Sequence, residues 1–490
     1  MKINCDWKIK ILTPVHIGGA QEKHWQEGLD FIIKDRKVYF LNQEKMINHW
    51  GIDRYSDFLA SGKIKELIKN IKIEDFSDRV EPISGKTEEI RQHIKNAASG
   101  KPIIPGSSLK GALRSVIFKY LIDQSHHSIN GKNAESKIFG KISEDFMRFI
   151  QVGDVEFERT EILNTKILSL NERKNLGWKN RRKGSEANLN EKYFTTGYEC
   201  IAPNQYTTAK IKFDLEGYRR AENIVHTPKG LENLFSAQFE ETLFNIINEH
   251  SRSYFKKELG YFDRYVQFGS DAEYIEQAKA DIVSLKNDLF AKQRASLRVA
   301  AGSGFHSITG DWQFKDHLID KIGDRNRGMR NGKESAKTRK LSFQHSKEKK
   351  RYSFSPMGYI QFLTEEDYNE NIAPAVEARK SRILEEKRRA AEEERKKQEE
   401  EKRKAEEAKK PKMTPKEKIK KDFKYVDIEV LEWKFRNLKV KPYVEGFQET
   451  IYKLKLPNPV EKGTILKLKM KLIAKGKKLQ HEGRPIPKER

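Results

Sequence analysis

A run of charged residues near position 390 constrains the fold of this chain more than any other feature. Residues 376–411 are almost wholly Glu, Lys, Arg and Ala, with 14 basic and 11 acidic side chains and a net charge of +3. Acids stand three and four residues before bases, as in residues 392–397, which stabilises an isolated helix. No apolar stripe recurs at heptad spacing, so a coiled coil is not expected. The segment is predicted to be a solvated single helix, roughly 50 Å long, that acts as a spacer.

The spacer separates a mixed α/β body, residues 1–365, from a tail, residues 412–490. The chain of 490 residues is long enough for two to four domains. Within the body, residues 8–12 alternate polar and apolar side chains, as a half-buried strand does. Further strands are predicted at 30–33, 37–41 and 209–213, with a hairpin turn at 34–36, and helices at 107–123 and 231–248. Two basic stretches, 171–192 and 321–351, are predicted to be mobile surface loops.

The tail is short, basic and patterned like β-structure. It carries 22 basic and 10 acidic residues, so its net charge of +12 is nearly half of the +25 of the whole chain. Alternation at 426–431 and 464–472, punctuated by Gly and Pro, predicts a small β-barrel of OB type that binds single-stranded nucleic acid through stacked aromatics. A docking domain for another protein is the alternative. At least half of the tail's aromatics are expected in its core; those that qualify for stacking are Trp433, Phe435, Tyr443, Phe447 and Tyr452.

The overall composition favours a polyanionic partner. An excess of 97 Lys and Arg over 72 Asp and Glu makes RNA, DNA or an anionic surface a candidate. No stretch of about 18 apolar residues predicts a membrane span, and the first residues do not resemble a signal peptide. Two cysteines, Cys5 and Cys200, are too few for a disulfide framework or a Cys-based zinc site. A cytoplasmic protein without metal or cofactor is expected.

The segment 103–114, Ile-Ile-Pro-Gly-Ser-Ser-Leu-Lys-Gly-Ala-Leu-Arg, carries the strongest functional signal. Pro-Gly predicts a turn, and Ser107 or Ser108 can cap the helix that follows. Lys110 and Arg114 lie off its apolar face, near free backbone N–H groups, which is an arrangement that binds phosphate. Gly111 would let RNA approach closely. An ordinary capped helix with solvated charges explains these residues equally well.

Two glycine-rich turns accompany this helix start. Thr13-Pro-Val-His-Ile-Gly-Gly19 ends the first strand, and residues 300–306, Ala-Ala-Gly-Ser-Gly-Phe-His, lie late in the body. Such turns can present N–H donors to phosphates. Either turn alone is a weak signal.

The three segments occur in this order and together resemble the RAMP superfamily of CRISPR proteins. Residues 149–155 and 355–360 are also similar to the Csm-type member that ends the backbone filament of type III-A effector complexes and caps the 3′ end of the guide RNA. This resemblance covers about residues 1–365 and implies an α+β, ferredoxin-like (RRM-like) body with insertions. It implies guide RNA, target RNA and neighbouring RAMP backbone and small subunits as partners. The spacer and tail depart from the usual family length, so nothing about them follows from it.

The resemblance also implies an RNA path along the three segments. Lys110 and Arg114 would hold phosphates, and the glycine turns would line the same path. The residues implied in RNA binding are His16, Gly18, Gly19, Ser107, Ser108, Lys110, Gly111, Arg114, Gly302, Ser303, Gly304, Phe305 and His306.

Catalysis is not expected. A metal-independent ribonuclease needs an acid and a base within reach of one phosphate, and no spacing pairs the candidate histidines His16, His24, His126, His127 and His306. Asp154 is an aspartate candidate, but it lies in a strand-like segment. No zinc-protease, Walker or Cys-x-x-Cys motif occurs. The leading hypothesis is a non-catalytic guide-RNA-binding subunit. The alternatives are a RAMP ribonuclease acting on guide precursor or target RNA, and a free single-strand-binding protein that uses only the tail.

Overall fold

The computed structural model divides into two compact units, the N-terminal unit Met1–Glu377 and the C-terminal unit Ala378–Arg490. The residues that it describes are 3–19, 24–61, 66, 71–124, 134–169, 177–180, 184–186, 195–227, 231–268, 272–287, 294–304, 338–346, 351–409, 423–444, 447, 451–473 and 478–487.

A five-stranded antiparallel sheet forms the centre of the N-terminal unit. Its order is β15-β18-β1-β14-β8. β1 has the predicted alternation, with Trp7, Ile9 and Ile11 fully buried and Lys8 and Lys10 on the other face. The strands are β1 (Ile3–Ile11), β8 (Ile150–Val152), β14 (Tyr206–Phe213), β15 (Arg294–Arg298) and β18 (Tyr359–Leu363).

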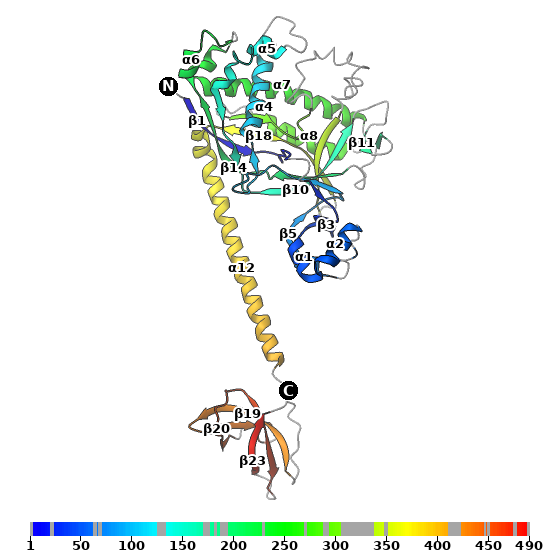
Figure 1. Cartoon of the computed structure of the whole chain (residues 1–490), viewed down its shortest axis with the longest axis vertical. Helices are drawn as coiled ribbons and strands as arrows, with labels where there is room; N and C mark the ends of the chain where they lie inside the picture. The colour runs from blue at the N-terminus through cyan, green and yellow to red at the C-terminus, as the bar shows by residue number, and fades with distance from the viewer. Residues whose placement is uncertain are drawn as a thin grey trace. The chain divides into compact units, whose positions relative to one another are not determined.

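Two helices cover one face of this sheet (Figure 1). α4 (Gly106–Gln124) follows β1 and α7 (Phe239–Phe268) follows β14, and both contribute to the core that contains the buried residues of β1. The predicted α+β class is confirmed. The helix expected at 107–123 is confirmed as α4, whereas the one expected at 231–248 begins as a 3-10 turn, η4 (Glu232–Phe235), before α7.

A second sheet lies beside the first and corrects one prediction. β11 (Gly177–Asn180) and β12 (Gly184–Glu186) lie within 171–192, and β16 (Thr338–Ser346) within 321–351, so neither stretch is wholly a loop. Main-chain pairing to the long strand β10 (Thr160–Ser169) forms these strands despite their polar composition. The other strands of this sheet are β2 (Trp25–Gln26), β6 (Glu89–Arg91), β13 (Thr196–Ile201) and β17 (Arg351–Pro356).

A small three-stranded sheet with two short helices completes the N-terminal unit, around its own cluster of buried side chains. The predicted hairpin is confirmed: Lys34 pairs with Lys37 across a two-residue turn. This part contains β3 (Phe31–Lys34), β4 (Lys37–Leu41), β5 (Ser77–Pro82), α1 (Gln43–Trp50), α2 (Ile52–Ala60) and η2 (Ile73–Phe76). The remaining short elements are β7 (Ile103–Ile104), β9 (Val155–Glu156), α5 (Ala134–Phe139), η3 (Phe146–Phe149), α6 (Leu215–Arg220), α8 (Ala272–Asn287), α11 (Glu365–Asp367) and η7 (Tyr368–Ile372).

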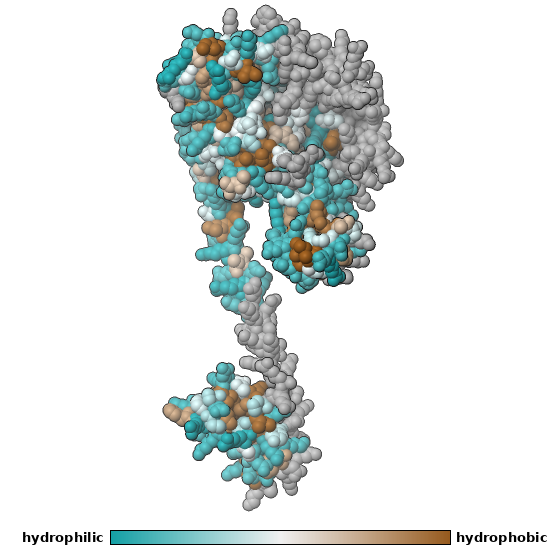
Figure 2. Space-filling model, in the orientation of Figure 1, coloured by the Kyte–Doolittle hydropathy of each residue, from teal (hydrophilic) through white to brown (hydrophobic). Residues whose placement is uncertain are grey.

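The charged segment forms the long helix α12 (Ala373–Lys409), which confirms the predicted helix as far as the described residues extend. Its 37 residues span about 55 Å at roughly 1.5 Å per residue. The side chains at 378–397 are exposed, and the part of the helix visible in Figure 2 is mostly hydrophilic. Ion pairs join Glu385 to Arg389 and Glu392 to Lys396, one turn apart, as the sequence pattern predicts.

The C-terminal unit contains a five-stranded antiparallel sheet of order β21-β20-β19-β22-β23. β19 pairs with β22 along its first half and with β20 along its second, with a bulge between Val430 and Glu432 that curls the sheet. Within the described residues no pairing joins β21 to β23, so the predicted barrel is not closed there. The strands are β19 (Lys424–Lys434), β20 (Asn437–Pro442), β21 (Tyr452–Lys455), β22 (Ile465–Leu472) and β23 (Leu479–Pro487).

Candidate nucleic-acid interface

The three sequence motifs lie together in the N-terminal unit. The N–H of Ala301 in the late glycine turn donates to the carbonyl oxygen of His16 in the first turn, at 3.0 Å. The ring of His93 joins the third segment, because its Nδ1 accepts from the N–H of Ile17 at 3.2 Å and its Nε2 lies 2.9 Å from the carbonyl oxygen of Ile103. Ile103 lies in β7, directly before α4. Residues far apart in the sequence therefore form one continuous surface, and sequence reasoning missed His93, which connects them.

His16 is a neutral, buried part of this surface. It is 3% exposed, and its Nδ1 donates to the carbonyl oxygen of Glu199 at 2.7 Å. Its ring packs edge-on against Tyr198, with ring centroids 4.7 Å apart. Burial lowers the pKa of His16 to about 4, so the ring carries no charge near neutral pH. His16 can offer a hydrogen bond or a packing surface, but not a cation.

The cations beside His16 come from two other strands. Lys340 in β16 donates from Nζ to the hydroxyl of Tyr198 at 2.7 Å. The guanidinium of Arg91 in β6 lies 5.5 Å from the centroid of the same ring. Arg91 is exposed and Lys340 half-buried, so both can contact phosphate. No local pattern distinguishes either residue, because only the pairing of distant strands brings them to His16.

A buried carboxylate holds the neighbouring strands together. Glu199 in β13 has a fully buried side chain, which makes ion pairs with Arg79 at 3.0 Å and with Lys95 at 2.9 Å. It also accepts from the hydroxyl of Thr160 at 2.9 Å and from the N–H of His93 at 3.2 Å. Burial alone would raise the pKa of Glu199, but the two cations lower it below its usual range. Glu199 is thus an ionised anchor rather than a proton donor.

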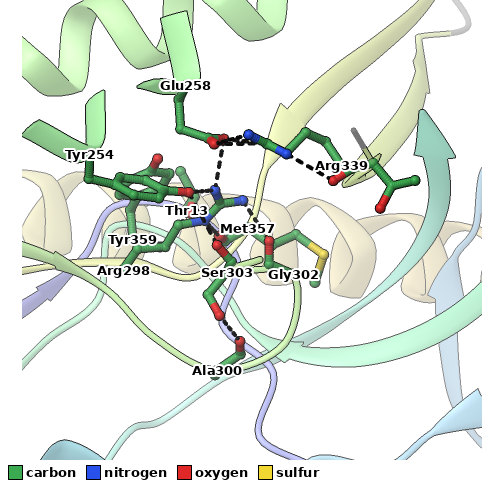
Figure 3. Close-up of polar contacts among 11 residues, drawn as sticks. Thr13, Tyr254, Glu258, Arg298, Ala300, Gly302, Ser303, Arg339, Met357 and Tyr359 are labelled. Carbon is green, nitrogen blue, oxygen red and sulfur yellow. Dashed lines mark hydrogen bonds and ion pairs between the residues drawn. The ribbon is translucent and has the colours of Figure 1, made fainter. Parts of the chain in front are cut away.

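The late glycine turn rests on a buried ion-pair network (Figure 3). Arg298 donates to the carbonyl oxygen of Gly302 at 2.7 Å and to that of Met357 at 2.8 Å. It also pairs with Glu258 at 3.2 Å, which in turn pairs with Arg339 at 2.6 Å. All three charged side chains are at most 5% exposed. Such a network fixes the turn, because Arg298 is held by a buried carboxylate while it donates to the carbonyl oxygens of Gly302 and Met357.

The backbone of this turn requires glycine. Gly302 has φ +86°, and a Cβ there would meet the Met357 Cβ at 3.2 Å, so a side chain is disfavoured twice. Ser303 is buried and donates to the carbonyl oxygen of Ala300 at 2.7 Å, so its hydroxyl is held within the turn. Gly304 is exposed. The other two predicted contacts, Phe305 and His306, lie outside the described residues.

The first glycine turn exposes its backbone next to His16. Gly18 is exposed and Gly19 partly exposed, and Gly18 forms an isolated bridge with His93. A Cβ on Gly18 would meet only the Nε2 of His16, at 3.6 Å. The turn therefore leaves room for a bound strand to approach this ring.

The start of α4 differs from the predicted cap. Ser107 and Ser108 are exposed but lie inside the helix, which begins at Gly106. The N–H of Gly106 instead donates to a carboxylate oxygen of Asp154 at 2.7 Å. A Cβ on Gly106 would meet the carbonyl oxygen of Val152 at 2.1 Å, so only glycine fits there. Asp154 lies between β8 and β9 rather than in a strand, and its contact is structural.

The two predicted phosphate-binding side chains of α4 have different surroundings. Lys110 is half-buried, and burial lowers its pKa. Arg114 forms ion pairs with Asp145 and, at 3.6 Å, with Glu135, and its guanidinium lies 3.9 Å from the Phe139 ring centroid. The same two carboxylates line an open cavity of about 760 Å³ beside Arg114. A phosphate would compete with them for Arg114, whereas no ion pair of Lys110 occurs among the described side chains. Gly111 is exposed, with no atom within 4 Å of an added Cβ.

The structure brings together a histidine pair that sequence spacing did not indicate. The rings of His16 and His93 lie 5.9 Å apart. Both nitrogens of His93 are engaged, and burial lowers its pKa to about 4, as it does for His16. An acid with this pKa is not protonated near neutral pH. The pair is therefore poorly suited to general acid catalysis.

The described residues offer neither a candidate metal site nor a membrane-spanning helix. They contain no group of three or more His, Cys, Asp or Glu side chains able to hold a metal ion. None of their helices is long and apolar enough to cross a membrane.

Comparison with known proteins places this fold in a family. A model of the RAMP superfamily matches residues 8–274, more than half of the chain, and the chain belongs to the RAMP superfamily. Among curated proteins it is similar to the CRISPR system Cms protein Csm5 of Streptococcus thermophilus, at 30% identity over 23% of this chain. The chain spans 37% of the length of that relative. It is thus a Csm5-like RAMP protein.

Solved structures match this chain at lower identity. A chain of the Csm-crRNA-target RNA ternary complex of a type III-A CRISPR-Cas system matches with a TM-score of 0.50 and 19% identity, over 74% of this chain and 100% of that chain. Csm5 of T. onnurineus matches with a TM-score of 0.46 and 18% identity, over 72% of this chain and 99% of that one.

Proposed function

We propose that this chain is a guide-RNA-binding subunit of a type III CRISPR effector complex, which caps the protein backbone at the 3′ end of the guide and does not cut RNA. The observation that carries the proposal is the union of three glycine-containing motifs through His16, His93 and Ala301, beside Arg91 and Lys340. Exposed backbone N–H groups and cations are the groups that contact RNA phosphates. The low pKa of His16 and of His93 leaves the site without a general acid near neutral pH. Membership of the RAMP superfamily and similarity to Csm5 support it.

The proposed partners follow from the same similarity. A ferredoxin-like sheet with insertions would carry guide RNA along the glycine turns, with target RNA and neighbouring RAMP backbone and small subunits adjoining it. The exposed residues Gly18, Ser107, Ser108 and Gly111 would face the RNA backbone. Lys110 would contact a phosphate directly. Arg114 would chiefly position α4 through its two carboxylate partners.

A RAMP ribonuclease acting on guide precursor or target RNA is the second candidate, and the proximity of His16 and His93 is the observation that favours it. The low pKa of both rings and the engagement of both His93 nitrogens count against it. Incubation of the purified complex with labelled RNA separates the two. The non-catalytic function predicts equal cleavage by wild type and by His16→Gln and Asp154→Ala variants.

Guide retention tests the leading proposal. A variant with Arg91→Ala and Lys340→Ala should retain less guide RNA in the purified complex, and the slope of log affinity against log salt should fall by about two. Lys387→Ala with Arg388→Ala, on the exposed face of α12, removes the same charge elsewhere. If both double variants hold guide RNA equally well at every salt concentration, the site is misplaced.

Single variants distinguish the roles of the two cations of α4, Lys110 and Arg114. Lys110→Ala should lower the salt slope by about one and change stability little, because Lys110 forms no ion pair among the described side chains and the nearby charges of Asp145 and Arg114 act on it in opposite directions. Arg114→Ala should lower the thermal stability of the N-terminal unit, because it leaves Asp145 without its cation. An unchanged salt slope in Lys110→Ala would remove Lys110 from the proposed site.

A further inference from the structure

The turn between β19 and β20 presents an aromatic ring to solvent. Lys434 pairs with Asn437, so Phe435 and Arg436 form a two-residue hairpin turn, with φ +49° and +63°. Turns of this kind need positive φ at both central positions and are normally built from Asn and Gly. The Phe435 side chain is 83% exposed. A large apolar ring thus occupies a position where neither turn geometry nor burial favours it.

Other aromatics of the C-terminal unit have structural roles. Trp433, Phe447 and Tyr452 pack against the core of the sheet, as at least half of the tail's aromatics were expected to do. The hydroxyl of Tyr443 donates to Glu429. The ring of Phe435 has a different neighbour, the ammonium of Lys434, 5.8 Å from its centroid.

In a second hairpin of the chain, a turn residue with positive φ has a structural role within the fold. Asp35 and Arg36 also have positive φ, at +51° and +57°. There Arg36 donates from its guanidinium to the carbonyl oxygen of Ser84 at 2.7 Å, so the side chain of the turn joins two segments of the fold. Phe435 joins nothing comparable in the described structure.

Lysines gather on the strands next to this turn. On the outer face of β20 and β21, Lys439 lies directly opposite Lys453, and Asn437 lies opposite Lys455. Like charges in directly opposed positions destabilise a sheet. Lys439 has one acidic partner, Glu432, at 2.7 Å. Lys453 and Lys455 are exposed and have no ion pair among the described side chains.

Two lysines of β22 face acidic residues instead. Lys467 lies across from Asp427, and Lys469 forms an ion pair with Glu482 at 3.3 Å. Lys471 lies over the ring of Phe423, at 4.2 Å from its centroid. Lys453 and Lys455, on the strand next to the hairpin of Phe435, face no acidic residue across the sheet.

We propose that this turn and face form a binding site for single-stranded nucleic acid, in which Phe435 stacks on a base and Lys434, Arg436, Lys453 and Lys455 contact phosphates. An exposed ring within a cationic surface is the arrangement that binds single strands without sequence preference. In OB folds, single strands lie on the second and third strands and on the loop between the first and second. β20, β21 and the β19–β20 turn have these places in the chain order of the C-terminal unit. The proposal is independent of guide binding by the N-terminal unit.

The full-length chain tests this site with two probes, oligouridine and oligothymidine of about 20 nucleotides, which exceed the roughly 4–16 nucleotides bound by one OB fold. Fluorescence anisotropy gives the affinity, and photocrosslinking of thiouridine-containing RNA followed by peptide mass spectrometry gives the location. A crosslinked peptide that contains Phe435 is expected. Phe435→Ala should reduce this crosslink and weaken binding by roughly 5- to 150-fold, the range for loss of one stacked base. Comparable affinity for both probes indicates a general single-strand site, and preference for oligouridine indicates an RNA site.

Matched variants come from the other half of the sheet. Tyr425→Ala removes an aromatic that is 54% exposed on β19, and Lys467→Gln with Lys469→Gln removes two lysines that face Asp427 and Glu482. Both should bind RNA nearly as wild type, whereas Lys453→Gln with Lys455→Gln should lower the salt slope by about two. Crosslinks confined to residues outside 424–487 would overturn this proposal. They would not contradict the proposed binding of guide RNA by the N-terminal unit. A second outcome would also overturn the proposal. If the Phe435→Ala variant crosslinks to RNA as wild type does but the purified complex loses a protein subunit, the turn docks a protein instead.

Discussion

The two proposed nucleic-acid sites of this chain are built in opposite ways. Around His16 the important groups are buried and engaged, with Glu199 held by two cations and Arg298 held beneath the glycine turn. Around Phe435 the ring is exposed and the nearby Lys453 and Lys455 are unpaired in the described structure.

The site around His16 would therefore bind through a preformed shape, and the site around Phe435 through exposed charge and ring stacking. A preorganised surface loses little conformational entropy on binding, and so suits a strand that stays bound. An exposed ring with exposed lysines binds through stacking and counterion release, so it suits a strand that binds and dissociates as the salt concentration changes. The first site should therefore depend on fold stability, and the second should not.

The largest expected effect tests the buried network. Arg298→Ala leaves Glu258 with Arg339 as its remaining described cation and should destabilise the N-terminal unit by about 3–5 kcal/mol, the usual cost of breaking a buried pair. Denaturant unfolding followed by tryptophan fluorescence measures it. Arg389→Ala, which breaks an exposed pair on α12, is the control and should cost less than about 0.5 kcal/mol. Similar losses in the two variants would contradict the preorganised-site model.

The next effect is pH dependence. Folding holds His16 and His93 at a pKa of about 4, below the 6.5 of an ordinary histidine, so the unfolded chain binds more protons between these values. The stability of the N-terminal unit should be greatest above about pH 6.5 and fall as the pH drops toward 4, by roughly 3 kcal/mol for each ring. Hydrogen exchange at several pH values measures this, with His93→Gln reducing the loss. The described part of the C-terminal unit has no buried histidine, so an equal loss there would argue against this cause.

A smaller effect separates stability from binding at α4. Gly111→Ala removes an exposed helical glycine and should stabilise the N-terminal unit by about 0.5–1 kcal/mol, yet weaken guide retention if RNA approaches this turn. Gly260→Ala in α7 is the matched variant, since an added Cβ there also meets no atom within 4 Å. Thermal melting and guide retention are measured for both. Equal retention in the two variants would place RNA away from Gly111.

The smallest effect concerns α12. A peptide of residues 373–409 should show helical circular dichroism at low salt, and its helicity should decrease in high salt, because each exposed ion pair contributes only about 0.3–0.5 kcal/mol. A random-coil spectrum at low salt would show that the helix depends on the rest of the chain.

Sequence patterns predicted the elements that have a local sequence signal. β1 follows from alternation, α4 from its apolar face, and α12 from ion pairs one turn apart. The turn of Asp35 and Arg36 follows from the polar residues between two apolar runs. The basic stretches were misread because β11 and β16 are formed by pairing to β10 and β12 by pairing to β11, and a polar composition does not reveal that pairing.

The candidate site was predictable only in part, for the same reason. The glycine motifs predicted the main-chain part of the site, because turns and helix starts have local sequence signals. His93, Arg91 and Lys340 have no such signal, since strands distant in the sequence bring them to His16. Arg114 pairs with Asp145 and Glu135, which lie too far away in the sequence for helical spacing to indicate the contact. A side chain that looks unpaired in the sequence is therefore paired in the fold.

The position of β1 has a consequence for synthesis. It precedes both of its partner strands in the chain, yet it lies between them in the middle of its sheet, flanked by β14 and β18. Its partners, residues 206–213 and 360–363, are made much later. At about 5–20 residues per second, the buried face of β1 stays without its second partner for roughly 20–70 s. A nascent chain of this protein therefore needs a chaperone or rapid local collapse over that interval, whereas the strands of the C-terminal unit all emerge within one short stretch, residues 424–487.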